Sequence, residues 1–524
     1  MIVIEQLIAQ NVRDFFLAPG SRSTPLALAA ARSPNARLHR HFDERGLGFF
    51  AMGCALGKQT PTAIIVTSGT ATGNLTPAIM EAYHASIPLI VLTADRPQEL
   101  LDVSANQATD QTKMFQNFVR WQCEIDLSMP TQAISSKVAQ AVFRSQFPHP
   151  GPVHINCPFR EPLYDPSSTS TPAHPIVLKT PLFTPTSPIS LPSRGLCLIG
   201  RLPKPSDLDA VLDFAKRAQW PVFADLLSNA RLSASEELIR HYDFRFWSHP
   251  PKPDCIVHFG ERFTSKRLLE WCTAHPPKEY IHVSPHSSWV DPSALITQRI
   301  AADVALTAQT LTATPDPTWL PLWKESDHLP PIDATFTETS AIRTISNLPF
   351  ENWAFFLGNS MPIREADWFL FPKKARGFFA NRGLSGIDGN IATIGGLSIG
   401  LNAPVIGILG DVTALHDLNS MAVLKSSPNP IILLISNNQG CGIFSHLPVA
   451  KDPHFDQLFG FSHELHFEHA ARLFELSYAS ASTQDELELA LRDALQSKAS
   501  SIIEMKTSRV LNHAHHAQMK QACV

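Results

Sequence analysis

The sequence predicts an α/β protein of three doubly wound domains in tandem. Two observations favour this fold class: short apolar runs alternate with helix-like segments along most of the chain, and two stretches rich in proline, serine and threonine interrupt the alternation. A chain of 524 residues also has the length of about three domains at roughly 150 residues each. Its 44% hydrophobic residues are enough for several cores.

The two proline-rich stretches divide the chain. They cover residues 165–193 and 313–336, and both have the composition of interdomain linkers. We therefore expect domains at residues 1–180, 190–312 and 335–524.

Each expected domain contains apolar runs of strand length. Runs separated by helix-like segments are typical of doubly wound sheets. In chain order, the predicted strands are 15–18, 63–67 and 89–93 in the first domain, 196–199, 221–224, 255–259 and 280–283 in the second, and 404–409 and 431–435 in the third.

Composition argues against several classes of protein. A net charge of −4 and a pI near 6.6 give no general attraction to nucleic acid or anionic membranes. No apolar run approaches the roughly 20 residues of a membrane span, and residues 1–5 lack the basic start of a signal peptide. The eight cysteines are scattered without CxxC spacing, which favours reduced thiols in a cytoplasmic protein.

A pair of motifs in the third domain predicts a cation site. The run 404–409 leads into Gly410 and Asp411, and the run 431–435 is followed closely by Asn438. Two parallel strands joined by a helix place these positions at neighbouring carboxyl-terminal strand ends, where α/β sheets bind ligands. One carboxylate, one amide oxygen and a nearby backbone carbonyl form an oxygen site that suits Mg²⁺ bound together with phosphate.

The spacing of these motifs resembles the diphosphate-binding motif of thiamin-diphosphate enzymes, in which NN follows GD by less than thirty residues. Such enzymes need a carboxylate beside N1′ of the aminopyrimidine, and Glu44, just before an apolar helical segment, is the candidate. Taken alone, Glu44 would be interpreted as a surface or helix-capping residue. Its position in the first domain favours the cofactor role, because thiamin enzymes divide the two roles between domains.

Basic and polar residues occur at predicted strand–helix junctions. Ser21 and Arg22 lie in a Gly-Ser turn before a helical stretch, where backbone N–H groups and a forked guanidinium bind anions. Taken singly, each arginine would be a solvated or salt-bridged surface residue. Together they favour a site for substrates with several carboxylates. The other members of the set are Arg96, Asn106, Gln107, Lys266, Arg267, Ser360, Arg364 and Arg382.

A glycine-rich segment at 381–389 precedes another helical stretch. It contains Ser385, Gly386 and Ile387, and such a loop lets the backbone approach a cofactor and place one apolar side chain under it. An ordinary long turn remains the alternative.

Three other patterns favour a structural interpretation. Gly440-Cys441-Gly442 lacks the third glycine of a dinucleotide turn. His463 and His466 fall one residue short of the HExxH spacing, and with His469 they favour one face of a helix. The C-terminal histidines 513, 515 and 516 are interpreted as a solvated tail.

Several segments resemble one family, the 2-succinyl-5-enolpyruvyl-6-hydroxy-3-cyclohexene-1-carboxylate synthases, which are thiamin-diphosphate enzymes of menaquinone and phylloquinone synthesis. PGSRSTPL at 19–26 and NRGLSGIDG at 381–389 are the most specific, and the resemblance is weakest in the middle domain. The segments are 18–31, 41–53, 66–82, 92–100, 105–111, 153–164, 358–367, 381–393 and 410–420.

The resemblance implies a pyrimidine-binding, a middle and a diphosphate-binding domain, in a homodimer or homotetramer with active sites at the subunit interface. It implies thiamin diphosphate and Mg²⁺ (or Mn²⁺) as cofactors, and no nucleic acid partner. The implied reaction is decarboxylation of 2-oxoglutarate and 1,4-addition of the succinyl carbanion to isochorismate. Both substrates are dianions at neutral pH, which agrees with the set of cationic residues.

The resemblance also assigns residues. By position, Glu44 matches the family's N1′ glutamate, and Asp411, Asn438 and Gly440 match its metal ligands. The implied cofactor-binding residues are Glu44, Ser385, Gly386, Ile387, Gly410, Asp411, Asn438, Ile443 and Phe444. Ser360, Arg364 and Arg382 match residues around 2-oxoglutarate, and Ser21, Arg22, Arg96, Asn106, Gln107, Lys266 and Arg267 match those around isochorismate. The implied catalytic set is Glu44, Arg22, Arg96, Gln107, Ser360, Arg364 and Arg382.

The chain departs from the family pattern at the metal loop. After Asn438 the family usually has Asn-Gly-Gly, whereas this chain has Gln439, Gly440 and Cys441, so the carbonyl ligand is kept. Two alternatives stay open: a thiamin-dependent 2-oxoacid decarboxylase or ligase with other substrates, and a non-catalytic relative.

Overall fold

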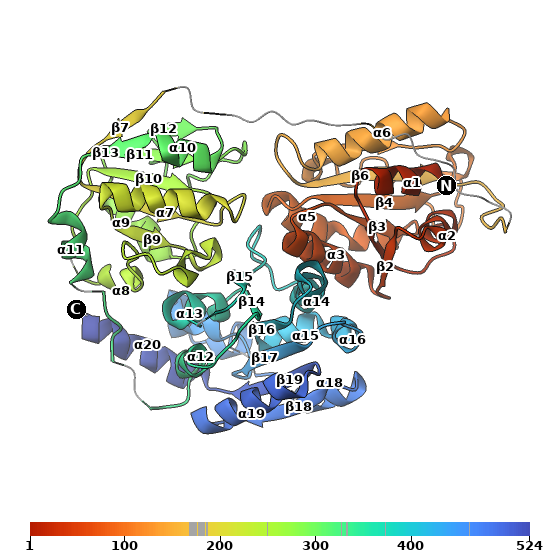
Figure 1. Ribbon diagram of the computed structural model, residues 1–524. Helices are drawn as coiled ribbons and strands as arrows, with labels where there is room; N and C mark the ends of the chain where they lie inside the picture. The colour runs from red at the N-terminus through yellow and green to blue at the C-terminus, as the bar shows by residue number, and fades with distance from the viewer. Residues whose placement is uncertain are drawn as a thin grey trace.

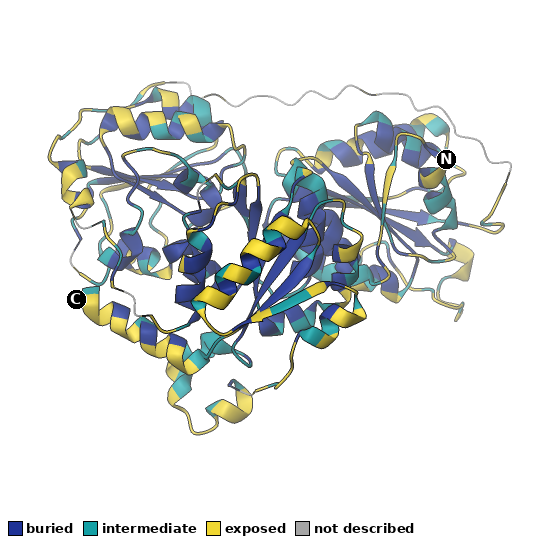
Figure 2. Ribbon diagram, turned by 60° about the horizontal axis from the view of Figure 1, so that its bottom comes forward, coloured by how far each residue is buried: buried dark blue, intermediate teal, exposed yellow. Residues whose placement is uncertain are grey.

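A computed structural model describes residues 1–166, 176, 184, 187–248, 250–325, 327–331, 334–372, 374–460 and 462–523 of the 524. These residues form three α/β units, each with helices packed on both faces of a parallel sheet (Figure 1). The strands at the centre of each unit are buried, while the outer helices expose one face (Figure 2). The predicted fold class is confirmed.

The first unit is built on a six-stranded sheet in the order β2-β1-β3-β4-β6-β5. Its strands are β1 (Asp14–Leu17), β2 (Arg37–Arg40), β3 (Thr62–Val66), β4 (Leu89–Asp95), β5 (Trp121–Glu124) and β6 (Pro152–Pro158). Its helices are α1 (Ile2–Ala9), α2 (Thr24–Arg32), α3 (Glu44–Lys58), α4 (Thr70–Asn74), α5 (Thr76–His84) and α6 (Thr131–Arg144).

The middle unit has a five-stranded sheet in the order β12-β11-β10-β8-β9 and a small β13-β7 pair. Its strands are β7 (Ile189–Leu191), β8 (Gly195–Ile199), β9 (Val222–Ala224), β10 (Cys255–Phe259), β11 (Glu279–Val283), β12 (Gln298–Ile300) and β13 (Leu311–Ala313). Its helices are α7 (Asp207–Ala218), α8 (Tyr242–Arg245), α9 (Lys266–Ala274), α10 (Val304–Thr310) and α11 (Trp319–Lys324).

The last unit repeats the six-stranded design, in the order β15-β14-β16-β17-β19-β18. Its strands are β14 (Ala354–Leu357), β15 (Gly377–Phe379), β16 (Val405–Gly410), β17 (Ile431–Asn437), β18 (Ser477–Ala481) and β19 (Ser501–Lys506). Its helices are α12 (Glu338–Ser346), α13 (Met361–Phe369), α14 (Asn390–Leu401), α15 (Asp411–His416), α16 (Met421–Lys425), α17 (Phe455–Leu458), α18 (Glu468–Leu473), α19 (Gln484–Ser497) and α20 (Arg509–Cys523).

The strand orders of the first and last units correspond position by position. In the first sheet the direction of winding reverses between β1 and β3, and in the last sheet it reverses between β14 and β16. A reversal of this kind opens a crevice at the carboxyl ends of the strands, where doubly wound sheets bind ligands. The topology therefore creates one such crevice in each of these two units.

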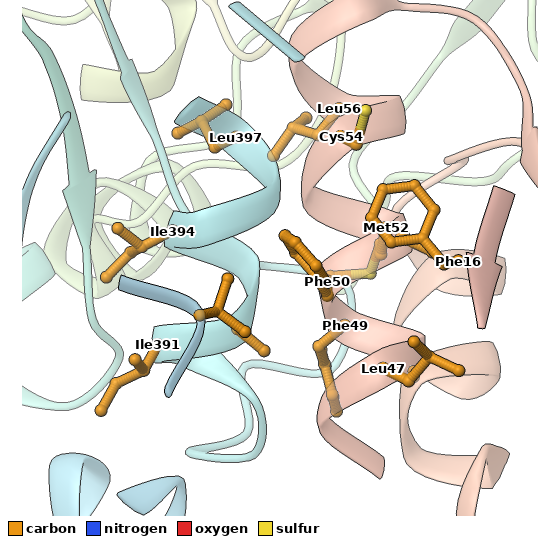
Figure 3. Packing of buried hydrophobic residues seen from close by; sticks show 14 of the residues in the cluster. Phe16, Leu47, Phe49, Phe50, Met52, Cys54, Leu56, Ile391, Ile394 and Leu397 are labelled. Carbon is orange, nitrogen blue, oxygen red and sulfur yellow. The ribbon is translucent and has the colours of Figure 1, made fainter. Parts of the chain in front are cut away.

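Helices α3 and α14 join the first unit to the last. Their backbones nearly touch: a Cβ on Gly53 would lie 2.1 Å from the carbonyl oxygen of Thr393, and one on Gly396 would lie 2.0 Å from that of Phe50. Apolar side chains of both helices belong to one continuous core (Figure 3). Since Gly53 faces Thr393 and Gly57 faces Gly400, the two helices run in the same direction and their N-termini lie together.

The two predicted linkers have different outcomes. Most of 165–193 lies outside the described residues, except that β7 near its end pairs with β13. The segment 313–336 is more than a linker, because it contains α11, whose Trp319 and Trp323 are buried in the core of the middle unit. The proline-rich composition of this segment predicts a linker, whereas tertiary packing stabilises a helix there. The domain boundaries themselves stay predictions.

Among the helices that the structure describes, none combines the length and the apolar character needed to cross a membrane.

We expect Gly396→Ala to lower the free energy of unfolding by about 1–3 kcal/mol or more, because the added methyl group would push α14 away from Phe50. Thermal unfolding followed by circular dichroism measures the loss. Gly73→Ala is the matched control, since a Cβ there meets open space and alanine favours a helix. Equal losses in the two variants would contradict the close α3–α14 contact.

Candidate functional site

The predicted cation ligands lie together at the crevice of the last unit. β16 and β17 are adjacent and parallel, with Gly410 opposite Ser436. Asp411 is the first residue of α15, and Asn438 directly follows β17. Because the two strands are parallel neighbours, both residues lie at the same edge of the sheet. This is the arrangement that the sequence motifs predict.

Backbone donors hold the Asp411 carboxylate. Its Oδ2 accepts hydrogen bonds from the N–H groups of Asn438 (3.1 Å) and Gly440 (2.9 Å), and its Oδ1 accepts one from Val412 (2.7 Å). Burial raises the pKa of Asp411, and these donors and His463 act against that rise. Gly440 has φ +115°, a conformation that glycine adopts far more readily than other residues.

The donors at this edge fit a hard divalent cation. They comprise a buried carboxylate on Asp411, the Oδ1 of Asn438 and the backbone of Gly440. Oxygen atoms of these types are what Mg²⁺ and Mn²⁺ bind in proteins, usually together with phosphate oxygens. The residues present are therefore suited to a cation that carries a diphosphate.

The glycine-rich segment connects β15 to α14. Asn359 fixes it, since its Nδ2 donates to the carbonyl oxygens of Asn381 (2.8 Å) and Gly386 (2.7 Å). Ser385 at φ +62° and Gly389 at φ +58° bend the chain. Three apolar side chains in and near the crevice are half-buried, which leaves part of their surface accessible to a ligand: Ile387, Ile443 and Phe444.

Glu44 is the first residue of α3. The helix cap is the neighbouring Asp43, whose side chain accepts from the N–H of Arg45 (2.9 Å), so the helix-capping alternative does not apply to Glu44. The Glu44 carboxylate is partly exposed and has no hydrogen-bond partner within the described residues. Arg45 donates to the carbonyl oxygen of His416, at the end of α15. The N-terminus of α3 thus touches the helix that begins with Asp411.

A cavity of about 490 Å³ lies beside this contact. Its walls include Arg45 and Phe49 of α3, Asn74 of α4, and Gly386 and Asp388 of the glycine-rich segment. The first and last units both contribute to it.

Glu81 of α5 fastens the glycine-rich segment to the first unit. Its carboxylate accepts hydrogen bonds from the N–H groups of Gly383 (2.5 Å) and Leu384 (2.7 Å). Part of the cavity wall is therefore held by a contact between the two units.

The crevice of the first unit gathers predicted anion-binding residues around Ser68. Arg96 donates to its hydroxyl, and Gln107 donates to its carbonyl oxygen (2.9 Å). Burial lowers the pKa of Arg96, and the nearby positive charge of Arg22 lowers it further. Arg22 itself donates to the carbonyl oxygen of Phe159 (2.9 Å) and keeps a buried Nε with no partner among the described residues.

Ser21, Asn106 and Gln107 are exposed residues of the same first-unit loops. Arg22 also pairs with Glu161 at 3.6 Å, but its buried Nε stays without a described partner, so these loops can still bind an anionic ligand.

The last unit holds a second cationic group. Burial lowers the pKa of Arg364 and lowers that of Arg382 to about 10, the latter also through the neighbouring charges of Arg262 and Arg364. Arg364 donates to the carbonyl oxygen of Ser360, and Arg382 donates to Asn359 Oδ1 (2.8 Å). Ser360 adopts φ +72° and ψ −126°, a strained conformation of the kind that clusters at ligand sites.

The predicted pair of the middle unit has partners of its own. Arg267 bonds to Asp243, and its guanidinium lies over the rings of Trp247 (4.2 Å to the centroid) and Trp368 (4.5 Å). Lys266 pairs with Glu270 on the exposed face of α9, and its side chain is 86% exposed. The structure thus does not leave Arg267 unpaired, whereas the first-unit arginines keep donors free.

Arg262 is not among the site residues that the sequence predicts. It donates to the carbonyl oxygens of Arg382 and Gly383 (3.0 Å) and to Ser385 Oγ (3.1 Å). The middle unit therefore contacts the glycine-rich segment. No spacing in the sequence marks this arginine.

Two structural interpretations of histidines were wrong. His463 and His466 lie in an irregular segment before α18 instead of on a helix, and His463 is buried with Nε2 at 3.3 Å from Asp411 Oδ2. The C-terminal histidines lie on α20 rather than in a solvated tail. His515 is 3% exposed, and His516 bonds to Glu365 (2.6 Å).

Family models match the chain in three places. They describe the N-terminal TPP binding domain of thiamine pyrophosphate enzymes (residues 1–116), a middle domain of thiamine pyrophosphate (189–357) and the C-terminal TPP binding domain of thiamine pyrophosphate enzymes (365–505). The predicted type of three-domain fold is thereby confirmed.

Proteins named 2-succinyl-5-enolpyruvyl-6-hydroxy-3-cyclohexene-1-carboxylate synthase are similar over nearly the whole chain. The protein of Roseiflexus sp. (strain RS-1) is 35% identical over 96% of this chain and 94% of its own length. That of Chlorobaculum parvum (strain DSM 263 / NCIMB 8327) is 35% identical over 99% and 95%. That of Bacillus velezensis (strain DSM 23117 / BGSC 10A6 / LMG 26770 / FZB42) is 35% identical over 99% and 96%.

Proposed function

The chain belongs to the 2-succinyl-5-enolpyruvyl-6-hydroxy-3-cyclohexene-1-carboxylate synthase family, and on this basis we propose that it decarboxylates 2-oxoglutarate and joins the remaining four-carbon unit to isochorismate. It is an enzyme that uses thiamin diphosphate and a divalent cation. Its product is the compound for which the family is named, an intermediate of menaquinone biosynthesis.

One observation carries the assignment of the site: Glu44 and Asp411 are the first residues of two helices that are in contact through Arg45 and His416. Thiamin diphosphate needs a carboxylate at its pyrimidine and a cation at its diphosphate. The contact at His416 and the six-residue length of α15, about 9 Å, support the proposal that both groups serve one cofactor.

The cofactor supplies the electron sink that makes loss of CO₂ from a 2-oxo acid feasible. Glu44, which accepts no hydrogen bond from the described residues, would exchange a proton with N1′ of the aminopyrimidine. Asp411 and Asn438, together with the carbonyl of Gly440, would hold the cation that accompanies the diphosphate.

The apolar side chains Ile387, Ile443 and Phe444, with Ser385 and Gly386, cover the reacting centre and keep water from it. Water exclusion matters here because water would otherwise compete with the second substrate for the reacting centre.

Each of the two substrates is assigned to a separate set of cationic and polar residues. We assign 2-oxoglutarate to Ser360, Arg364 and Arg382, since half-buried arginines that form no ion pair with a described carboxylate are matched to a dicarboxylate. We assign isochorismate to Ser21, Arg22, Arg96, Asn106 and Gln107 of the first unit, with Lys266 and Arg267 of the middle unit at its margin.

We further propose a homodimer or homotetramer with active sites at the subunit interface, in the cytoplasm. The assembly is proposed from the family. The compartment is supported by the cysteines, all eight of which are free thiols.

The test of the proposed function is an assay of purified protein with thiamin diphosphate, Mg²⁺, 2-oxoglutarate and isochorismate, each omitted in turn. We expect loss of isochorismate absorbance only when all four are present. Release of CO₂ without consumption of isochorismate would identify a 2-oxoacid decarboxylase instead. Absence of any cofactor dependence would identify a non-catalytic relative.

We predict that Glu44→Gln lowers kcat by about 10²–10⁴-fold, because an amide cannot exchange the N1′ proton. The circular dichroism spectrum should stay unchanged, since Glu44 makes no bond within the described residues that supports the fold. Near-normal turnover in this variant would refute the assignment of Glu44.

We predict opposite substrate effects for two arginines. Arg364→Ala should raise KM for 2-oxoglutarate by about 10–100-fold, and Arg96→Ala should do the same for isochorismate, because each loses charge-assisted hydrogen bonds of about 1.5–3 kcal/mol. Arg492→Ala, which removes only a surface pair with Glu488, is the control. Equal effects of both variants on both substrates would show that the two pockets are wrongly divided.

A further inference from the structure

Two buried side chains from outside the sequence motifs contact the two cation ligands. The first is Glu338, the first residue of α12, which Thr337 caps. Glu338 is 4% exposed, and its Oε1 accepts a hydrogen bond from Nδ2 of Asn438 at 2.6 Å. An asparagine amide has one nitrogen and one oxygen, so a partner that binds the nitrogen decides where the oxygen points.

The orientation of the Asn438 amide follows from this contact. With Nδ2 turned to Glu338, the Oδ1 faces the loop side, where it accepts from the N–H of Gly440 (3.2 Å). That is the side on which Asp411 lies. A flipped amide would present a donor to the cation instead of an oxygen.

The second side chain is His463. It is 8% exposed, and its Nδ1 accepts from the N–H of Leu465 (3.0 Å), which leaves the proton of the neutral ring on Nε2. This Nε2 lies 3.3 Å from Oδ2 of Asp411 and has no well-aligned hydrogen-bond acceptor among the described residues. A buried donor therefore lies close to the same oxygen that the backbone of Asn438 and Gly440 binds.

The residues around Glu338 leave its carboxylate available to bind Asn438. The neighbouring buried carboxylate, Glu365, has its own donors in Thr339 (2.9 Å), Asn512 (3.1 Å) and His516 (2.6 Å). Asn438 is the only side chain among the described residues that donates to Glu338. The two carboxylates thus have separate roles, Glu365 in joining α20 to α12 and Glu338 in contacting the metal loop.

We propose that Glu338 and His463 are positioning residues of the cation site, which orient the Asn438 amide and the Asp411 carboxylate for a divalent ion. The inference rests on the cation site of the proposed function. Partners behind metal ligands typically change metal affinity by about 10–100-fold when removed. A purely structural role would lower the stability of the fold without altering cation affinity.

The experiment is a calorimetric titration of Mg²⁺ into the full-length protein at saturating thiamin diphosphate. We expect Glu338→Ala and His463→Ala each to weaken Mg²⁺ binding by about 10–100-fold. Glu338→Gln keeps an oxygen acceptor for Asn438, and His463→Gln keeps an N–H donor for Asp411. Both glutamine variants should therefore bind Mg²⁺ within about threefold of the parent protein.

Two matched controls separate positioning from stability. Thr339→Val removes a buried hydrogen bond of the same helix start but touches neither ligand, and His466→Gln changes the other histidine of the His463 segment. Both should leave Mg²⁺ affinity unchanged, while Thr339→Val lowers the midpoint of thermal unfolding. If Glu338→Ala fails to fold, Glu338→Asp replaces it, since a shorter carboxylate cannot keep the 2.6 Å contact.

Wild-type Mg²⁺ affinity in both alanine variants would overturn the proposal, as would equal losses in the alanine and glutamine variants. A parent protein that binds Mg²⁺ and thiamin diphosphate but does not consume isochorismate would refute the proposed function and leave this comparison intact. A parent protein that binds no Mg²⁺ would overturn both.

Discussion

The close contact of α3 with α14 is the constraint on which the site depends. Glycines at Gly53 and Gly396 let the two backbones meet, and the shared apolar core around Phe50 fixes the pair. Because the helices run in the same direction, their N-termini lie together. One of these ends carries Glu44, and the other follows the glycine-rich segment, so the packing of two apolar helices determines the geometry of the polar groups at their ends.

The first and last units share one topology, but the residues at their ligand crevices carry charges of opposite sign. In both, the ligand crevice lies where the strand order reverses. The first unit fills this place with Arg22 and Arg96, while the last fills the end of β16 with Asp411. Under the proposed function, isochorismate and the metal-bound diphosphate therefore have separate edges, whereas 2-oxoglutarate is assigned to Arg364 and Arg382 of the last unit.

The sequence predicted what depends on local pattern. Apolar runs identified the central strands, and the residues after β16 and β17 identified Asp411 and Asn438, because parallel strands bring their carboxyl ends to one edge. Contacts between distant segments could not be predicted. Glu338 lies 100 residues before Asn438, and its position on α12 follows from packing against α13 and α20. The burial of Trp319 and Trp323 could not be predicted either, because their proline-rich surroundings have the composition of a linker.

Arg364 and Arg382 of the last unit form no ion pair with a described carboxylate, and this bears on the ligand that they would bind. Arg364 and Arg382 lie half-buried near each other and near Arg262, and partial burial together with mutual repulsion lowers the pKa of Arg382 to about 10. A fold under no functional constraint would pair such charges with carboxylates, as Asp243 pairs Arg267. The lack of such compensation among the described residues supports the proposal that a dicarboxylate binds at these arginines. Because a ligand that binds only the folded state stabilises it, such a substrate would offset the charge imbalance.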